Sequence, residues 1–411
     1  MGRVVFICLL LGVGAWNAPG PKPYKLAYPS YFGNRVNLRE DNPLTEEGIL
    51  LGRYLFYDKR LSRNSTVSCA SCHQQALAFT DGRRFSVGFD SVLTRRSSMS
   101  LANLLWVRNF FWDGRVSTLE AQAMVPLTEA HEMGQRMDSL IPKLSAVGMY
   151  GPLFAAAFGS PEVTQDGIVR ALAQFERTLV SANAPYDKYI RGEYAMTPAE
   201  MRGLRLFFGR AVCGNCHGGP KTFNETYHNN GLDRGAFADS GRYDVTGLDY
   251  DKGRFRVVTL RNIALTAPYM HDGRFKTLEE VVDHYSEHIE PSATLSPTLK
   301  DTANVPTMLR LTKGEKGDLV AFLKTLTDSG FVHDPRFSDP FAGGGPRGTA
   351  GSEGLRVGGR SRGAAGLGGL RVGGGSRGAA GSGGLRVGGG WRGAVGLGRS
   401  GRVTGDGVLK K

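Results

Sequence analysis

The amino-acid sequence predicts a mainly α-helical protein with two similar domains and a disordered, Gly/Arg-rich tail. Three observations lead to this prediction. Helix-start signals recur along the central part of the chain, strand-like alternation is scarce, and a helical segment followed by a cysteine pair occurs twice. A length of 411 residues also fits two or three domains.

Four segments carry a polar N-cap residue and, three positions later, the glutamate that opens many helices. They are residues 117–120, 197–200, 277–280 and 312–315, and the last precedes an apolar run at residues 319–326. The best strand candidate is residues 254–260. The central part of the chain is therefore expected to be helical, with long loops.

Residues 1–18 are typical of a secretory signal peptide. Arg3 precedes an apolar stretch, residues 4–13, and Val13-Gly14-Ala15 resembles a small-residue cleavage site. The alternative is a short buried N-terminal helix. Cys8 would leave with the signal, and we expect a periplasmic protein with no transmembrane segment after signal removal.

The tail, residues 341–411, holds most of the positive charge. It has 12 basic and two acidic residues, so only about +3 of the net charge of +13 belongs to residues 1–340. A Gly-Leu-Arg-Val-Gly-Gly unit begins at Gly354, Gly369 and Gly384, and the segment has 28 glycines. Ordering so many glycines is costly, which predicts disorder. Because the rest of the chain is nearly neutral, no nucleic-acid partner is expected.

The four remaining cysteines form two C-x-x-C-H motifs, Cys69-Ala70-Ser71-Cys72-His73 and Cys213-Gly214-Asn215-Cys216-His217. Two thiols at this spacing can form thioethers with one haem, and the histidine that follows can bind its iron. A zinc site built from both cysteine pairs would leave both histidines unexplained. A thioredoxin-like pair would not occur twice with a histidine attached. The sequence therefore predicts two covalently bound haem c groups.

A similar segment precedes each motif, Gly52-Arg53-Tyr54-Leu55-Phe56 and Gly203-Leu204-Arg205-Leu206-Phe207. This faint duplication predicts two cytochrome c-like domains with one haem each. We place them at residues 19–190 and 191–340, between the signal and the tail.

Residues 42–326 resemble the bacterial di-haem cytochrome c peroxidases and the related MauG enzymes. Besides both haem motifs in this order, the resemblance rests on residues 51–58, on Phe111-Trp112-Asp113-Gly114-Arg115 and on residues 260–273. It implies that His73 binds the iron of a catalytic, peroxide-reacting haem and His217 that of an electron-transfer haem. It also places Trp112 between the haems as the mediator of electron transfer. Without the resemblance, Trp112 would be interpreted as a core aromatic residue.

The resemblance further assigns Gln122 and Glu132 to the catalytic pocket, with Pro126 lining it. A carboxyl group beside haem-bound peroxide can take a proton from one oxygen and give it to the other, and an amide can orient the bound oxygen. Without the resemblance, Glu132 would be interpreted as a solvated helix residue.

Two departures from the peroxidase pattern favour the MauG-like subgroup. Where peroxidases that need prior reduction carry a distal histidine, this sequence has Phe89, and no histidine lies between His73 and His131. We therefore expect a catalytic haem that is five-coordinate or water-bound in the oxidised protein. Where the peroxidases place a methionine ligand on the second haem, the sequence has Tyr285.

Tyr285 is predicted to lie on the apolar face of a helix with Leu278, Val281, Val282 and Ile289. We expect it to bind the iron of the second haem; the alternative is a core tyrosine with a hydrogen-bonded hydroxyl. His284 and Met270 are rival ligands. The remaining histidines without motif support are expected at the surface: His228, His288 and His333.

The resemblance also implies a calcium ion between the domains. Thr266 and Pro268 match backbone oxygen donors, but Ser97 stands where the family has an asparagine side chain. A neutral hydroxyl is a weaker calcium ligand, so the calcium prediction is weakened.

These observations predict a di-haem peroxidase that reduces hydrogen peroxide to water with electrons from a small cytochrome c or cupredoxin. The first alternative is a MauG-like enzyme that uses peroxide-derived high-valent haem to oxidise side chains of a partner protein. The second is a di-haem electron-transfer protein without catalysis.

Overall fold

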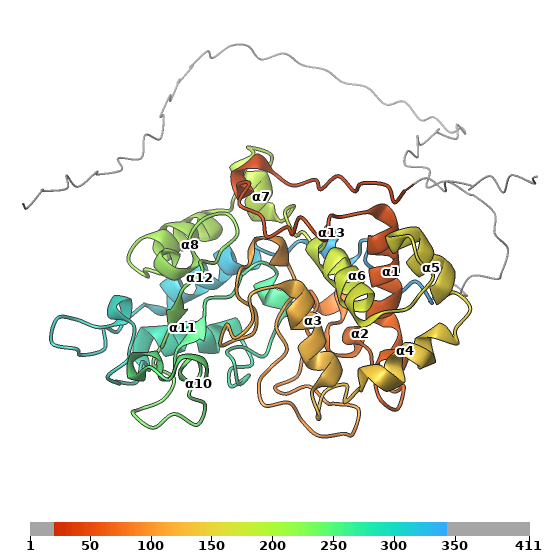
Figure 1. The fold of residues 1–411 in the computed structure, drawn as a ribbon. Helices are drawn as coiled ribbons and strands as arrows, with labels where there is room; N and C mark the ends of the chain where they lie inside the picture. Colours follow the sequence, from red (N-terminus) through yellow and green to blue (C-terminus); the bar gives the residue numbers. More distant parts are fainter. Residues whose placement is uncertain (1–19, 343–411) are drawn as a thin grey trace, which may run out of the picture. The chain divides into compact units, whose positions relative to one another are not determined.

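The computed structural model describes residues 20–342. The predicted signal peptide, Cys8 and the repeats of the tail lie outside the described residues. The mainly helical prediction is confirmed for the described part (Figure 1). Its α-helices are α1 Glu46–Tyr57, α2 Cys69–Cys72, α3 Leu119–Thr128, α4 Met137–Ser145, α5 Tyr150–Phe158, α6 Gln165–Arg177, α7 Pro185–Ile190, α8 Pro198–Phe208, α9 Gly214–His217, α10 Tyr243–Thr246, α11 Leu278–Glu287, α12 Lys313–Lys324 and α13 Ser329–Val332.

Short 3₁₀ helices connect these elements, at Ser30–Phe32, Lys59–Leu61, Gln75–Leu77, Leu104–Trp106, Asp249–Asp251, Ile263–Leu265 and Pro297–Leu299. One small antiparallel sheet pairs β1, Tyr227–His228, with β2, Phe255–Arg256. The strand expected at residues 254–260 is therefore real but much shorter. Past Arg256 the strand pairing ends. The amide of Val257 donates to the carbonyl of Thr226, and that of Leu260 donates to the hydroxyl of Thr222.

Three of the four predicted helix starts are confirmed, because Thr197, Thr277 and Thr312 all form capping boxes. The start at residue 117 is displaced by one position, since Thr118 is the N-cap and accepts from the amide of Ala121. Glu120 is thereby free of a capping role. It is buried and pairs with Arg177 at 2.7 Å.

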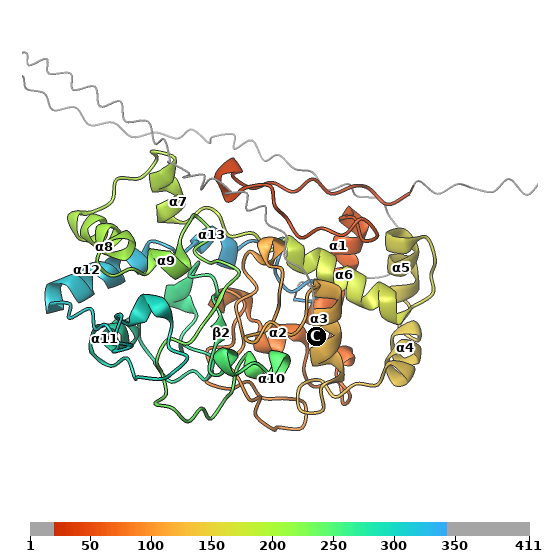
Figure 2. The same cartoon turned by 60° about the vertical axis from the view of Figure 1, so that its left-hand side comes forward.

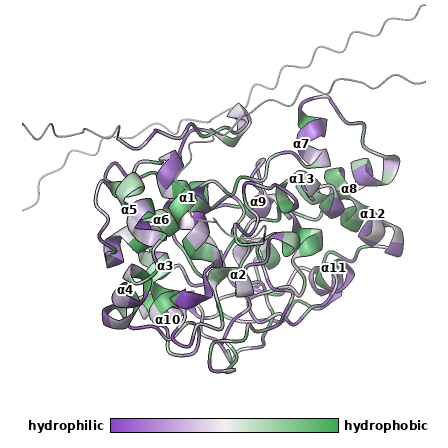
Figure 3. Cartoon of the chain, turned by 90° about the vertical axis from the view of Figure 1, so that its right-hand side faces the viewer, coloured by the Kyte–Doolittle hydropathy of each residue, from purple (hydrophilic) through white to green (hydrophobic). Residues whose placement is uncertain are grey.

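The hydrophobic core consists of two clusters. One gathers around α1, α3, α5 and α6, and the other around α8, α11 and α12. Figure 3 shows apolar and polar residues mixed along these helices, as expected when one face of each is buried. The end of the described part returns to the first cluster, because Phe331 and Phe337 pack in it.

The faint sequence duplication has a structural counterpart. A Cβ atom at Gly52 on α1 would overlap the carbonyl oxygen of Ala171 on α6, and one at Gly203 on α8 would overlap that of Asp318 on α12. Each glycine thus allows two helices to cross closely. Beside each crossing lies a motif helix, α2 next to α1 and α9 next to α8 (Figure 2). The two-domain boundary at residue 190 stays a prediction.

None of the described helices is by itself long and apolar enough to cross a bilayer. Helices α4 and α5 meet this condition only when joined, and they meet at 103°.

Candidate functional site

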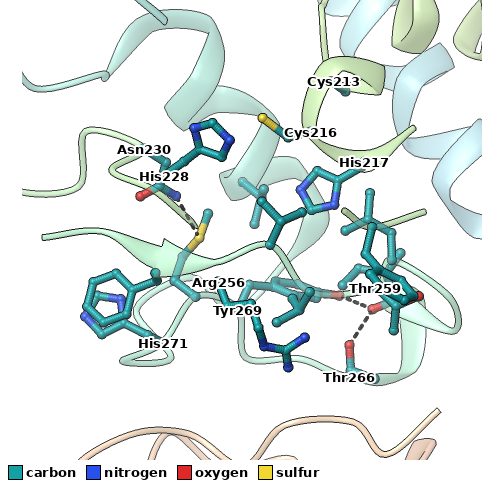
Figure 4. Close-up of a pocket in the computed structure, with 18 of the residues that line it drawn as sticks. Cys213, Cys216, His217, His228, Asn230, Arg256, Thr259, Thr266, Tyr269 and His271 are labelled. Atoms are coloured by element: carbon teal, nitrogen blue, oxygen red, sulfur yellow. Dashed lines mark hydrogen bonds between the residues drawn. The ribbon is translucent and has the colours of Figure 1, made fainter. Parts of the chain in front are cut away.

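The second cysteine motif lines a cavity of about 260 Å³ (Figure 4). Cys213, Cys216 and His217 form part of its wall, and most of the remaining wall is apolar. Neither cysteine forms a disulfide, so both sulfur atoms are available for thioether bonds. Burial raises the pKa of Cys213 to about 12, so its thiol is uncharged near neutral pH.

His217 is oriented as metal-binding histidines are. Its Nδ1 atom lies 3.2 Å from the carbonyl oxygen of Thr222, which leaves Nε2 for a ligand. Burial lowers the pKa of His217 to about 4, and the ring is therefore neutral at pH 7. A neutral, oriented imidazole and two unpaired thiols beside an apolar cavity fit a haem.

Three further side chains line the same cavity: Asn230, Met270 and Tyr285. Four members of the predicted helical face, Leu278, Val281, Val282 and Tyr285, line the cavity. Ile289 is buried but lies beyond the end of α11 at Glu287 and does not line the cavity. Burial raises the pKa of Tyr285 to about 12, an effect that the hydrogen bond from Asn230 opposes.

The rival ligand Met270 lines this cavity as well, whereas His284 packs elsewhere. His284 is buried, and its Nε2 atom lies 2.9 Å from the backbone oxygen of Asn230. The prediction of a surface position for His228 is wrong. The β1–β2 pairing brings His228 to the cavity wall, where its Nδ1 atom lies 2.9 Å from the hydroxyl of Ser296. His288 and His333 are exposed as expected.

The first motif has the same local plan. The Nδ1 atom of His73 lies 2.8 Å from the carbonyl oxygen of Phe79, and burial lowers the pKa of His73. Cys69 and Cys72 form no disulfide, and burial raises the pKa of Cys72 to about 11. The chemistry of this donor set also fits a haem.

The two predicted pocket residues come from α3 and the turn that follows it. Gln122 lies on α3, and its Oε1 atom is buried without a hydrogen-bond partner among the described residues. Glu132 lies in the turn that brings the amide of Met133 back to the carbonyl of Pro126, at 3.1 Å. An unpartnered buried acceptor costs free energy unless a ligand satisfies it. Gln122 is thus suited to meet a polar ligand.

Glu132 lies close enough to the first motif to influence its electrostatics. The pKa of the Cys72 thiol is raised first by burial, then by the charge of Asp81 and then by the charge of Glu132. The pKa of Glu132 itself is raised, chiefly by burial and then by Glu129, while Arg115 lowers it. A carboxyl group in this condition can exchange a proton closer to neutral pH.

Phe89 covers this turn. Its amide donates to the carbonyl of Glu132 at 2.9 Å, and its ring packs against Gly134. The neighbouring Asp90 accepts from His131 at 2.9 Å. Phe89 occupies the position at which the peroxidases would carry a distal histidine. Its loop is therefore hydrogen-bonded to the Glu132 turn and carries a phenyl ring there instead of an imidazole.

Trp112 lies on the wall of the second-motif cavity. Its indole Nε1 donates to the carbonyl of Ser97 at 2.9 Å, and its ring meets His271 edge-on at 6.5 Å. The adjacent Asp113 accepts from Arg96, which also binds Asp239. These contacts fix the tryptophan turn in one position.

The three predicted calcium residues lie near one another. Thr266 and Pro268 line the second-motif cavity, and the Ser97 hydroxyl donates to the carbonyl of Met270 at 3.0 Å. Among the described residues there is no group of three or more His, Cys, Asp or Glu side chains that could hold a metal ion. Calcium binding stays a prediction.

Sequence reasoning missed Asn230 and Glu176. Asn230 contacts both Tyr285 and Met270, and no local pattern marks it. Glu176 is buried with Oε2 unpartnered, and burial raises its pKa to about 8. A charged residue within the apolar face of residues 165–177 could have drawn attention to it.

Comparisons with known proteins identify relatives of this chain. A family model described as di-haem cytochrome c peroxidase matches residues 46–195. The chain is 40% identical over 287 residues to the methylamine utilization protein MauG of Methylorubrum extorquens, covering 69% of this chain and 79% of that protein. It is 35% identical over 288 residues to the cytochrome c551 peroxidase of Nitrosomonas europaea, covering 67% and 79%. Among solved structures, a MauG-like protein associated with microbial copper homeostasis has a TM-score of 0.73 and 40% identity, covering 77% of this chain and 99% of that chain.

Proposed function

The chain belongs to the di-haem cytochrome c peroxidase and MauG family of oxidoreductases, and from this premise we propose that it reduces hydrogen peroxide to water with electrons from an external donor. The reaction site is the first motif, with His73 as the iron ligand and Cys69 and Cys72 as the covalent attachment points. The second motif holds the electron-transfer haem. Export through residues 1–18 belongs to the same proposal.

Haem, when bound, supplies the iron that binds peroxide and exchanges electrons with it. The chain supplies the proton transfer. Glu132 takes a proton from one peroxide oxygen and returns it to the other, which then leaves as water. The raised pKa of Glu132 suits a group that must both accept and donate.

Gln122 orients the peroxide. Its buried Oε1 has no hydrogen-bond partner among the described residues and can accept a hydrogen bond from an O–H group of the peroxide. Trp112 is the proposed path for electrons, because it lines the second-motif cavity and is fixed by its hydrogen bond to Ser97.

The observation that carries the proposal is the contact between Phe89 and the Glu132 turn. A phenyl ring cannot bind iron, so Phe89 would leave the iron of a bound first haem accessible to peroxide in the fully oxidised protein. We therefore expect reaction with peroxide without prior reduction.

Rapid mixing of the fully oxidised protein with hydrogen peroxide tests this expectation. Its electron-paramagnetic-resonance spectrum should contain a high-spin ferric signal, and the absorption spectrum should change on mixing. Absence of the high-spin signal would favour the electron-transfer alternative. Reactivity that appears only after partial reduction would refute the role given to Phe89.

A second candidate is oxidation of side chains on a partner protein. It is favoured by Tyr285 on the cavity wall, because an anionic oxygen ligand would stabilise the oxidised forms of the second haem. Mass spectrometry of co-encoded proteins after incubation with peroxide distinguishes the candidates. Modified residues support partner oxidation, whereas turnover with only small redox proteins supports peroxide removal.

A further inference from the structure

One amide group joins two rival ligands on the wall of the second-motif cavity. The Nδ2 atom of Asn230 donates to the hydroxyl oxygen of Tyr285 at 3.1 Å and to the sulfur of Met270 at 3.4 Å. Figure 4 shows the Asn230 amide directed at this sulfur. A primary amide nitrogen carries two hydrogens, so one side chain can serve both acceptors at once.

The backbone around Asn230 is held from several directions. The side chain of Asn229 donates to the hydroxyls of Ser292 and Thr294, both at 2.9 Å. The amide of Glu290 donates to the carbonyl of Gly231 at 2.8 Å. His284 contacts the carbonyl of Asn230 itself. This backbone is therefore positioned before any ligand binds.

Met270 and Tyr285 would give haems with opposite properties. Both side chains reach the cavity that His217 lines. A neutral thioether favours the reduced haem and raises its potential, whereas a phenolate oxygen favours the oxidised haem. A residue that decides between them would set the role of this haem.

We infer that Asn230 is a positioning residue that selects Tyr285 over Met270 as the sixth ligand of the second haem. The inference rests on the proposed function, which assigns this haem to electron transfer. A hydrogen bond from an amide donor stabilises an anionic phenolate oxygen more than a neutral thioether sulfur, and the contact to Tyr285 is also the shorter of the two. The hydrogen bond to Tyr285 keeps its oxygen in the cavity. Hydrogen bonds from a residue that does not itself bind the metal commonly orient the side chains that do.

Replacement of Asn230 by leucine tests the selection, because leucine keeps the volume and removes both donors. The purified, haem-loaded Asn230→Leu protein should gain the sulfur-to-iron charge-transfer absorption of a methionine-bound ferric haem. Its low-spin electron-paramagnetic-resonance signal should split into two species. The midpoint potential of this haem should rise. A tenfold increase in the equilibrium preference for ferrous over ferric iron corresponds to a rise of about 59 mV in the midpoint potential of a one-electron couple.

Matched variants separate the possible failures. Met270→Leu alone should keep the parent spectrum, and Asn230→Leu with Met270→Leu should lack the sulfur band. Asn230→Ala repeats the test if the leucine variant binds less haem. An unchanged or lowered potential without a sulfur band in both Asn230 variants would overturn the selection by Asn230. If Tyr285→Phe leaves the low-spin spectrum unchanged, Tyr285 is not the ligand, and both the ligand assignment and the selection fall. The peroxide reaction at the first motif is measured separately and stands or falls on its own.

Discussion

Replacement of Glu132 by glutamine tests the proposed proton transfer most directly. Glutamine keeps the shape and hydrogen-bonding capacity of the side chain but cannot accept the peroxide proton. General acid–base catalysis contributes about 10²- to 10⁴-fold to a rate. That range corresponds to about 3 to 5 kcal/mol of activation free energy. The second-order rate constant of the oxidised protein with peroxide should fall by this factor, while haem content stays unchanged.

The pH dependence provides a second, independent measurement. Glu132 must be ionised to accept the first proton, so the rate should rise with pH through its pKa. Burial and the Glu129 carboxylate raise that pKa above its ordinary value of 4.5, and Arg115 lowers it. The acid limb should therefore lie at a higher pH than an exposed glutamate would give.

Glu129→Gln is the matched control, because Glu129 is exposed and carries no proposed catalytic role. Removing its charge should move the acid limb to lower pH and leave the plateau rate close to that of the parent. The limb should be absent from Glu132→Gln. Stopped-flow absorption from pH 4 to pH 9 (about the range in which carboxyl and histidine groups titrate) measures both effects. Parent-like rates in Glu132→Gln, or a limb that moves upward in Glu129→Gln, would refute the reasoning.

Four further predictions concern stability and the haem environment. Burial raises the pKa of Glu176 to about 8 from its ordinary value of 4.5, so its contribution to folding is present below pH 4.5 and is lost as the pH rises through 8. By linkage this loss is about 4 kcal/mol between pH 5 and pH 9; urea unfolding of Glu176→Gln should show a weaker pH dependence, and an equal dependence would contradict the assignment. Arg261→Met leaves Asp187 buried without its partner and should cost about 3–5 kcal/mol in chemical unfolding; a loss below 1 kcal/mol would be inconsistent with a buried ion pair. Phe89→His should remove the high-spin signal of the oxidised protein and make peroxide reactivity depend on prior reduction; a retained signal would show that this loop does not reach the haem. Deletion of residues 343–411 should leave haem content and peroxide reactivity intact, as measured by absorption and stopped flow, and a loss of either would assign the tail a role in the enzyme.

Local signals in the sequence predicted the elements that depend on neighbouring residues. The threonine caps at 197, 277 and 312 and the helical face of Tyr285 needed only short patterns. The same patterns were ambiguous where two residues compete. Ser117 and Thr118 both suit an N-cap, and the burial of Glu120 against Arg177 decides for Thr118. That ion pair joins positions 57 residues apart, which no local window includes.

Long-range packing explains the remaining misses. His228 was expected at the surface because no motif includes it, but β1 pairs with β2 and brings it to the cavity wall. Asn230 gained its contacts in the same way, through segments 40 and 55 positions away. Phe331 and Phe337 join the first core cluster although they follow the second motif. Each case depends on tertiary pairing, which overrides local propensity.

The two motif sites share one local plan, on which we propose two different chemistries. In both, the cysteines lie on a short helix or, for Cys213, at its N-cap, and the histidine contacts a backbone carbonyl, of Phe79 in one site and of Thr222 in the other. In both, the preceding helix crosses a partner at a glycine. The sites differ in segments far from the motifs. Near the first motif these segments supply Glu132 and the loop of Phe89. At the second they supply Tyr285 and its hydrogen-bond donor Asn230. Function commonly resides in loops placed on a common scaffold. Because both sites share the arrangement of cysteines and histidine, exchanging the distant side chains should exchange the spectroscopic properties of the two haems without loss of haem binding.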